Sequence, residues 1–164
     1  QVGDGDRCTF GQEEATVFDV PGHTRGHIAY WFAADDALFC GDTLFALGCG
    51  RLFEGTPAQM WKSLGKLKAL PDETRVYCAH EYTQANAKFA LSVDGDNAAL
   101  VARAEEIDAT RARGKPTVPS ILGIQKHPNP FLRADDPVLA RNLGLGGASA
   151  EEVFAEVRSR KDHF

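Results

Sequence analysis

Four short apolar runs, all within the first 80 residues, constrain the fold of this sequence more than any other feature. They are rich in Val, Phe, Tyr and Trp, and they span residues 15–21, 27–33, 37–42 and 74–80. Runs of this length, bounded by Gly, Pro and Asp, are typical of β-strands. Ala34 to Asp36 has the composition of a hairpin turn between the second and third runs. We therefore expect a sheet in the first half of the chain.

Helices are expected between the third and fourth runs and throughout the second half. Thr56 can cap a helix, with Pro57 in the first turn and Gln59 completing a capping box. The later helices are predicted at 83–93, 97–115 and 149–162, the last with Ser149 as its cap and Glu152 as its capping-box partner. Residues 116–133 contain four prolines and are expected to be largely irregular. The pattern predicts a mixed α/β (α+β) fold, with strands up to about residue 80 and helices after it.

Length and charge exclude several classes of protein. A chain of 164 residues can hold one domain, or one small domain with a subdomain. The net charge of −5 argues against a nucleic-acid partner, because phosphate binding usually requires a basic excess. No apolar run approaches the roughly 18 residues that a membrane span needs, so no membrane partner is expected.

The four cysteines, Cys8, Cys40, Cys49 and Cys78, form no CxxC pair. Their even number permits two disulfides. However, Cys40 and Cys78 lie inside apolar runs, where buried free thiols are common. This favours a reducing compartment, and we expect the protein to be cytoplasmic.

Three side chains that can bind metal lie where strand-like runs end. His23 follows the first run, Asp42 ends the third and His80 ends the fourth. His27 lies four residues after His23, but Pro21-Gly22 and Gly26 make this segment a loop rather than a helix that presents both rings on one face. Strand ends often meet at one rim of a sheet, and imidazole and carboxylate ligands suit zinc, iron or manganese. The alternatives are a turn or capping role for Asp42 and buried structural roles for the histidines.

Several segments in register resemble a known family. The motifs "PGHTRGH", "FCGDTLF", "GCGRLFEGT" and "VYCAHEYT", with the later "PTVPSILGIQKHPNPFLR" and "VRSRKDHF", are similar to those of hydroxyacylglutathione hydrolase, or glyoxalase II, in the metallo-β-lactamase superfamily. The resemblance implies that residues 1–80 are the second half of an αββα sandwich. It also implies that residues 81–164 form a helical domain that helps to bind glutathione.

The resemblance implies a site for two divalent metal ions. His23 would bind the first metal, Asp42 would bridge the two, and His80 would bind the second, whereas His27 matches no ligand and is expected to support the loop. The family's upstream THxHxDH motif is absent from this sequence, and the chain begins with Gln1 rather than Met. We therefore expect an incomplete chain that binds few metal ions or none, is inactive alone, and self-associates or pairs with its missing N-terminal half.

The resemblance also implies substrate contacts. Arg51 matches a basic contact, Phe53 falls where the family often has a tyrosine, and Tyr82 matches a substrate-contacting tyrosine. Arg158 and Lys161 match a basic pair that holds the glycine carboxylate of glutathione. Without the resemblance, the preferred interpretation of this pair is as cations in the last turn of a helix, where they complement the helix dipole.

The implied reaction is hydrolysis of S-lactoylglutathione, an S-(2-hydroxyacyl)glutathione thioester, to glutathione and D-lactate. A metal-bound hydroxide held beside Asp42 would attack the thioester carbonyl, with zinc as the first choice of metal. Two alternatives stay open: a glutathione-binding module that lacks a functional metal site, and another metallo-β-lactamase-fold thioesterase or sulfur dioxygenase.

Overall fold

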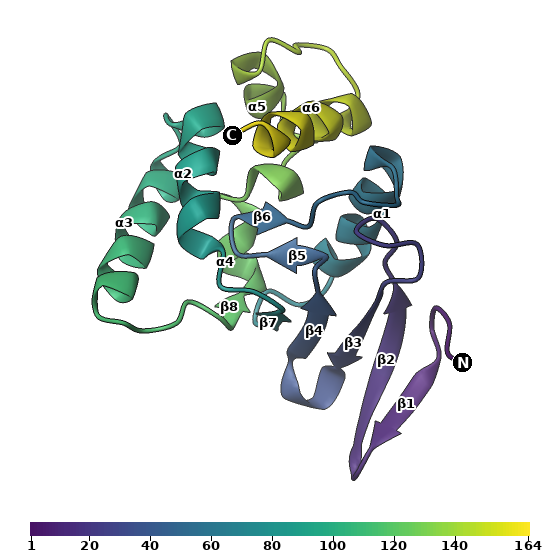
Figure 1. The fold of residues 1–164 in the computed structure, drawn as a ribbon. Coiled ribbons are helices and arrows are strands. Elements are labelled where there is room, and N and C mark those ends of the chain that lie inside the picture. The colour runs from purple at the N-terminus through teal and green to yellow at the C-terminus, as the bar shows by residue number, and fades with distance from the viewer.

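The computed structural model describes residues 1–164 and contains one six-stranded mixed sheet with the order β1-β2-β3-β4-β7-β8 (Figure 1). The strands span Arg7–Phe10 (β1), Glu13–Asp19 (β2), Ile28–Phe32 (β3), Ala37–Gly41 (β4), Arg75–Cys78 (β7) and Ser120–Ile121 (β8). Strands β4 and β7 are parallel, and all other neighbouring pairs are antiparallel. A separate small hairpin, β5 (Leu44–Phe45) and β6 (Gly48–Cys49), follows β4.

The predicted hairpin between the second and third runs is confirmed. Tyr30 pairs with Phe39, and a 3₁₀ turn at Ala33–Asp35 connects β3 to β4. Asp36 closes the turn with φ +47°, in the left-handed region that short polar residues tolerate best after glycine. The four predicted runs thus correspond to β2, β3, β4 and β7.

Helix α1 (Pro57–Lys68) begins where its capping box predicts. The Thr56 hydroxyl accepts a hydrogen bond from the Gln59 N–H at 3.2 Å, and the Gln59 side chain accepts one from the Thr56 N–H at 2.9 Å. Both bonds satisfy N–H groups that a helix start leaves without partners. Met60, Leu64 and Leu67 are fully buried on one face of the helix.

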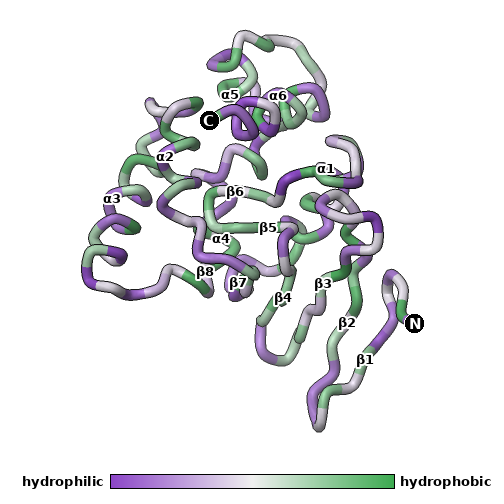
Figure 2. The backbone as a smooth tube through the Cα atoms, viewed as in Figure 1, coloured by the Kyte–Doolittle hydropathy of each residue, from purple (hydrophilic) through white to green (hydrophobic).

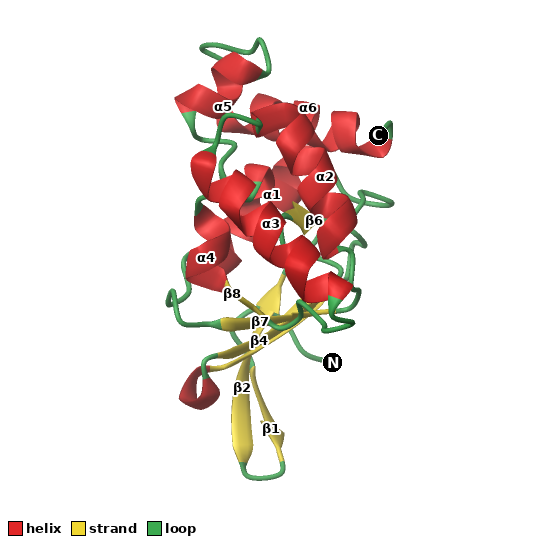
Figure 3. Cartoon of the chain, turned by 90° about the vertical axis from the view of Figure 1, so that its left-hand side faces the viewer, coloured by secondary structure: helices red, strands yellow, loops and turns green.

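The second half of the chain is mainly helical, as predicted, and its helices lie to one side of the sheet (Figure 3). They span Thr83–Asp94 (α2), Ala98–Ala112 (α3), Leu122–Lys126 (α4), Pro137–Asn142 (α5) and Ala150–Asp162 (α6), with a 3₁₀ turn at Pro130–Leu132 (η2). Ser149 and Glu152 form the predicted capping box of α6. The outer helix α3 alternates between hydrophobic and hydrophilic positions (Figure 2), consistent with a helix that buries one face only.

Several short elements were not predicted. The sequence indicated no strand before residue 15, but β1 pairs with β2 along the edge of the sheet. Most of its residues are exposed, so it carries no burial pattern. Strands β5, β6 and β8 are two residues long, too short for any periodicity. The segment 116–133, expected to be irregular, contains β8, α4 and η2, and the six-residue α5 was also missed.

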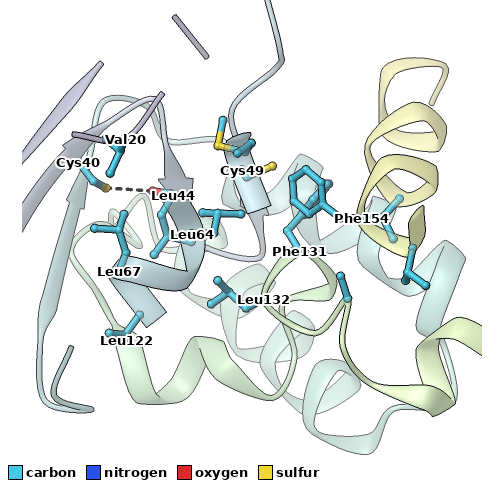
Figure 4. Close-up of a cluster of buried hydrophobic side chains, with 14 of the residues drawn as sticks. Val20, Cys40, Leu44, Cys49, Leu64, Leu67, Leu122, Phe131, Leu132 and Phe154 are labelled. Carbon is cyan, nitrogen blue, oxygen red and sulfur yellow. Dashed lines mark hydrogen bonds between the residues drawn. The ribbon is translucent and has the colours of Figure 1, made fainter. Parts of the chain in front are cut away.

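One main hydrophobic core joins both halves of the chain (Figure 4). Val20, directly after β2, and Cys40 of β4 pack in it with Leu64 and Leu67 of α1 and with Phe154 of α6. Helix α1 also contacts α6 directly. The core therefore crosses residue 80, where the strand-rich part of the sequence ends. No helix in the chain is both long enough and apolar enough to cross a membrane.

The opposite face of the sheet carries a cluster of aromatic rings. Phe39 stacks on Tyr77 with ring centroids 4.7 Å apart, and Phe32 meets Phe39 edge-on at 5.7 Å. Phe10 contacts Tyr30 at 5.4 Å. Phe10 and Phe39 are about half exposed, so we call these five rings the aromatic face.

Candidate metal and substrate site

The Asp42 carboxylate lies between two imidazoles. Its Oδ1 is 3.2 Å from Nε2 of His80, and its Oδ2 is 3.9 Å from Nε2 of His23. Asp42 follows Gly41, which ends β4 with φ +52°, a conformation that favours glycine. The Ala79 N–H donates to the Gly41 carbonyl at 3.0 Å and so ties the residue before His80 to this turn. Each carboxylate oxygen thus faces a different ring nitrogen.

The loop that follows residue 50 holds the His23 ring in place. Nδ1 of His23 is 2.8 Å from the carbonyl oxygen of Arg51, so the nitrogen donates and the oxygen accepts. Nε2, the nitrogen facing Asp42, is therefore left without a proton in the neutral ring. A backbone carbonyl that fixes one ring nitrogen in this way is the usual support of a metal-binding histidine. The Phe53 ring lies edge-on to His23 at 5.1 Å.

Close backbone contacts bring the loops together. A Cβ at Gly50 would lie 1.9 Å from the Asp42 carbonyl oxygen, so only glycine fits there. A Cβ at Gly55 would lie 2.6 Å from the Gly22 backbone, to which the Gly55 N–H donates at 3.1 Å. These glycines let segment 50–55 pack directly against the His23 loop and the Asp42 turn.

Two aromatic side chains, Tyr82 and Phe45, lie beside His80. The Tyr82 ring stacks on the His80 ring at 4.7 Å and meets Phe45 edge-on at 5.5 Å. Tyr82 is 50% exposed, so about half of its surface is open to a ligand. The intervening Glu81 points elsewhere, because it accepts hydrogen bonds from Thr117, including one from the Thr117 N–H at 2.7 Å. Burial alone would raise the pKa of Glu81, but these hydrogen bonds, helped by Thr83 and Arg111, hold it below its ordinary value.

One cavity of about 450 Å³ collects most of the predicted site residues. It is lined by His23, Asp42, Phe45, Gly50, Arg51, Phe53, His80 and Tyr82. Six of these eight were named from the sequence, and Phe45 and Gly50 were not. Phe53 is 68% exposed at the mouth, where its ring offers apolar contact but no hydroxyl.

The two remaining predicted residues, Arg158 and Lys161, lie outside the cavity lining. Arg158 is only 5% exposed and donates from Nη1 to the Cys49 carbonyl at 3.0 Å and from Nη2 to Asp162 at 3.0 Å. Asp162 also pairs with Arg51 at 3.3 Å, so a carboxylate that the sequence did not single out connects Arg158 to the cavity edge.

Lys161 is half-buried beside aromatic rings. Its Nζ lies 5.2 Å from the centre of the Phe89 ring and donates to the Ala85 carbonyl at 3.3 Å. Burial, together with Arg158 and Arg51 nearby, lowers the pKa of Lys161. Repulsion among these three cations favours the binding of an anion beside them.

The donor chemistry at Asp42 fits metal ions, but the number of donors is small. Imidazole nitrogen on each side of a shared carboxylate is suited to zinc, iron or manganese. Yet the structure contains no group of three or more His, Cys, Asp or Glu side chains placed to hold one ion. Each half of the site offers one ring nitrogen and one carboxylate oxygen, whereas zinc sites usually have three or four protein ligands.

All four cysteines are free thiols, and Cys40 and Cys49 are buried. Burial raises the pKa of Cys40 to about 12 and that of Cys49 to about 11, although Arg158 lies beside Cys49. A nucleophilic cysteine requires the opposite shift. Cys49 therefore has a structural role.

Comparison with known proteins agrees with the fold. Residues 1–80 match the family model of the metallo-beta-lactamase superfamily, and residues 81–164 match that of the hydroxyacylglutathione hydrolase C-terminus. The crystal structure of ETHE1 from Myxococcus xanthus is 26% identical, covers 97% of this chain and 51% of its own, and has a TM-score of 0.60. The metallo-beta-lactamase structure from Staphylococcus aureus, 20% identical over 94% of this chain and 36% of its own with a TM-score of 0.57, shares the fold. The protein thus has the fold of the metallo-β-lactamase superfamily.

Curated relatives narrow this class to one family. The hydroxyacylglutathione hydrolase of Rhodospirillum rubrum is 60% identical over 99% of this chain, and that of Ruegeria pomeroyi is 61% identical over 99%. The chain belongs to the hydroxyacylglutathione hydrolase family, and it spans 64% of the length of each of these relatives. The expected fold class, a metallo-β-lactamase-type mixed sheet followed by a helical domain, is confirmed.

Proposed function

We propose that this chain carries part of a two-metal site that hydrolyses the thioester of an S-(2-hydroxyacyl)glutathione, with S-lactoylglutathione as the substrate. The observation that carries the proposal is the Asp42 carboxylate, whose two oxygens face the Nε2 atoms of His80 and His23 at 3.2 and 3.9 Å. When bound, divalent metal ions, zinc first and iron or manganese as alternatives, would activate water and polarise the thioester carbonyl.

In this proposal, His23 and His80 each hold one metal and Asp42 holds both. The Arg51 carbonyl keeps His23 in the tautomer that leaves Nε2 free for a metal. Stacking on Tyr82 fixes the plane of the His80 ring. Phe45 and Phe53 line the cavity with apolar surface, which would exclude water from the bound acyl group.

Cations at one edge of the cavity would recognise the carboxylates of glutathione. Arg51 lines the cavity and Lys161 is the other accessible cation near Asp162, so we assign direct contacts to these two. Arg158 stays in the proposal in a different role, because its buried guanidinium holds the Cys49 carbonyl and Asp162 and thereby positions Arg51. Tyr82 supplies a hydroxyl beside the metal ligands.

We also propose that residues 1–80 carry the metal ligands, whereas residues 81–164 help to bind glutathione. Because each metal would have only one imidazole and one carboxylate oxygen from this chain, the chain alone is expected to bind little metal and to be inactive. The four free thiols suit a reducing cytoplasm.

A second candidate function is a glutathione-binding module without metal chemistry. It is favoured by the absence of any three-donor group in the structure. Metal analysis and ligand binding separate the two functions.

The experiment is elemental analysis and zinc titration of the purified chain, each repeated with Asp42→Ala. The two-metal proposal expects weak zinc binding that Asp42→Ala abolishes, because one side chain serves both metals. Zinc binding that is the same with and without Asp42→Ala would contradict the proposal. Binding of S-methylglutathione, a stable thioether, without any zinc binding would support the second candidate instead.

In any preparation that hydrolyses S-lactoylglutathione, kinetics test the residue roles. Asp42→Ala should abolish kcat, whereas Lys161→Ala should raise KM about tenfold, the loss expected for one charged hydrogen bond, with kcat little changed. Lys115→Ala, at an exposed lysine in the segment after α3, is the matched control and should change neither constant.

A further inference from the structure

His27 lies directly behind the turn that carries Asp42. Its Nε2 is 3.1 Å from the backbone nitrogen of Asp42 and 3.3 Å from the carbonyl oxygen of Cys40. One ring nitrogen cannot accept from the first group and donate to the second at the same time, so the tautomer of His27 decides which contact is a hydrogen bond.

The surrounding bonds favour the contact with Asp42. The Cys40 carbonyl already accepts from the Thr43 N–H at 3.0 Å, whereas the Asp42 N–H has no other acceptor in the structure. A partly buried N–H without an acceptor costs more free energy than a carbonyl that lacks a second donor. Nε2 therefore accepts, and the proton of the neutral ring lies on Nδ1.

The main chain of His27 connects this contact to the His23 loop. Its carbonyl accepts from the Val20 N–H at 2.8 Å, at the start of the loop that carries His23. Its ring also packs against Gly41, where a Cβ would lie only 2.6 Å from Nε2. One residue therefore contacts both the loop that holds His23 and the turn that holds Asp42.

We propose that His27 is a positioning residue: its Nδ1–H tautomer accepts a hydrogen bond from the Asp42 N–H and fixes the Gly41–Asp42 turn against the His23 loop. The significance of this position for metal binding rests on the proposed function, whereas the hydrogen bond does not. Glutamine at this position could place a side-chain oxygen close to where Nε2 now lies, and leucine would offer no acceptor.

The first test is the tautomer, read from long-range ¹H–¹⁵N spectra of the full chain with ¹⁵N-labelled histidine, at a mildly alkaline pH. The His27 signal is assigned by its loss in His27→Gln. We expect a protonated Nδ1 and an unprotonated Nε2, the minor form of free histidine. A protonated Nε2 would overturn the proposal.

The second test is hydrogen exchange at the Asp42 amide. His27→Leu should speed exchange about tenfold, as expected for the loss of roughly 1.4 kcal/mol of hydrogen bonding, and His27→Gln should restore protection. His127→Gln, at an exposed histidine in another part of the fold, is the control. Equal exchange in wild type and His27→Leu would overturn the proposal. If the leucine variant does not fold, the tautomer in wild type and the protection in His27→Gln still decide it.

Neither test uses activity or a metal ion. The zinc titration with Asp42→Ala judges the proposed function separately, so a failure of one proposal is not mistaken for a failure of the other.

Discussion

Gly50 leaves no room for a side chain beside the candidate metal ligands. A Cβ at this residue would meet the Asp42 carbonyl at 1.9 Å and His23 Nδ1 at 3.3 Å. We predict that Gly50→Ala lowers the free energy of unfolding by about 2 kcal/mol or more, because backbone rather than a flexible side chain must move. Urea unfolding followed by circular dichroism measures this.

Gly26→Ala is the matched control for Gly50→Ala. A Cβ at Gly26 would meet nothing within 4 Å, and its φ is not in the left-handed region, so the substitution should be neutral or slightly stabilising. Equal stabilities of the two variants would show that the contact between Gly50 and Asp42 is not tight in solution.

Glu81 should make the stability of the folded protein depend on pH in the acid range. The folded protein holds its pKa below the ordinary value of 4.5, so the folded state releases this proton more readily than the unfolded chain. The stabilisation is complete above pH 4.5 and is lost as the pH falls towards the lowered pKa. We predict that Glu81→Gln lowers the stability at pH 7 by about 1 kcal/mol.

The measurement is the urea midpoint of wild type and Glu81→Gln between neutral pH and pH 3. The two midpoints should converge as the pH falls, because protonation removes the same charge that the substitution removes. A constant difference over the whole range would assign the loss to packing instead of charge.

Residue identity predicted most of the residues that line the cavity, but not the residues that hold the lining in place. His23, Asp42 and His80 could be found because each follows an apolar run, and the family resemblance added Arg51, Phe53 and Tyr82. Gly50, Phe45 and Asp162 could not be found from residue type, since their roles depend on how closely another segment approaches. Arg158 shows the same limit: its sequence position indicates a cation but not its burial against Cys49.

Helix α6 depends on its first turn to present Phe154 and Val157 to the core. The Ser149 hydroxyl accepts from the Glu152 N–H, and Glu152 accepts from the Ser149 N–H at 2.8 Å. We predict that Ser149→Ala lowers the free energy of unfolding by about 1 kcal/mol, the usual value of an N-cap. Ser159→Ala, at an exposed serine in the same helix, should have almost no effect.

Thermal unfolding of both variants measures the difference. A Ser149→Ala melting point equal to that of Ser159→Ala would mean that the cap contributes nothing to the folded protein.

Elements with local signals were predicted well, and elements defined by distant partners were not. Helices α1 and α6 begin where Ser or Thr and Gln or Glu form capping boxes, which need only four neighbouring residues. Strand β8 exists because Ser120 pairs with Val76 of β7, a partner more than forty residues away. No sequence pattern within residues 116–133 predicts such a pairing.

At the scale of the whole molecule, the shared core predicts one cooperative unfolding transition. Leu139 of α5 is fully buried in the same cluster as Leu38 of the sheet. We predict that Leu139→Ala lowers the free energy of unfolding by about 2–5 kcal/mol. The unfolding midpoint reported by Trp31, in β3, should fall as much as the unfolding midpoint reported by circular dichroism. A Trp61→Phe background leaves Trp31 as the only tryptophan. If Leu139→Ala leaves the unfolding midpoint reported by Trp31 unchanged, the sheet and the helical part unfold as two independent units.

The aromatic face predicts association of the chain with itself. Phe39 is 46% exposed among four other rings, and exposed apolar clusters of this kind promote contacts between molecules. We predict that Phe39→Lys shifts the chain towards monomer in sedimentation velocity. Val138→Lys, which alters a residue that is 47% exposed on α5, should leave the distribution unchanged. A wild-type chain that stays monomeric at all concentrations would contradict this prediction.

The position of α6 near the end of the chain also determines when the core can close during synthesis. Cys40 and Val157 share one core, so translation must add more than a hundred residues between them before that core can close. At about 5–20 residues per second, the core face of strands β2 to β4 waits on the order of ten seconds at the ribosome before α6 can complete its cover, although α1 is available earlier. Ribosome-associated chaperones would therefore encounter a partly covered apolar surface, and slow codons between Cys40 and Val157 would lengthen that exposure.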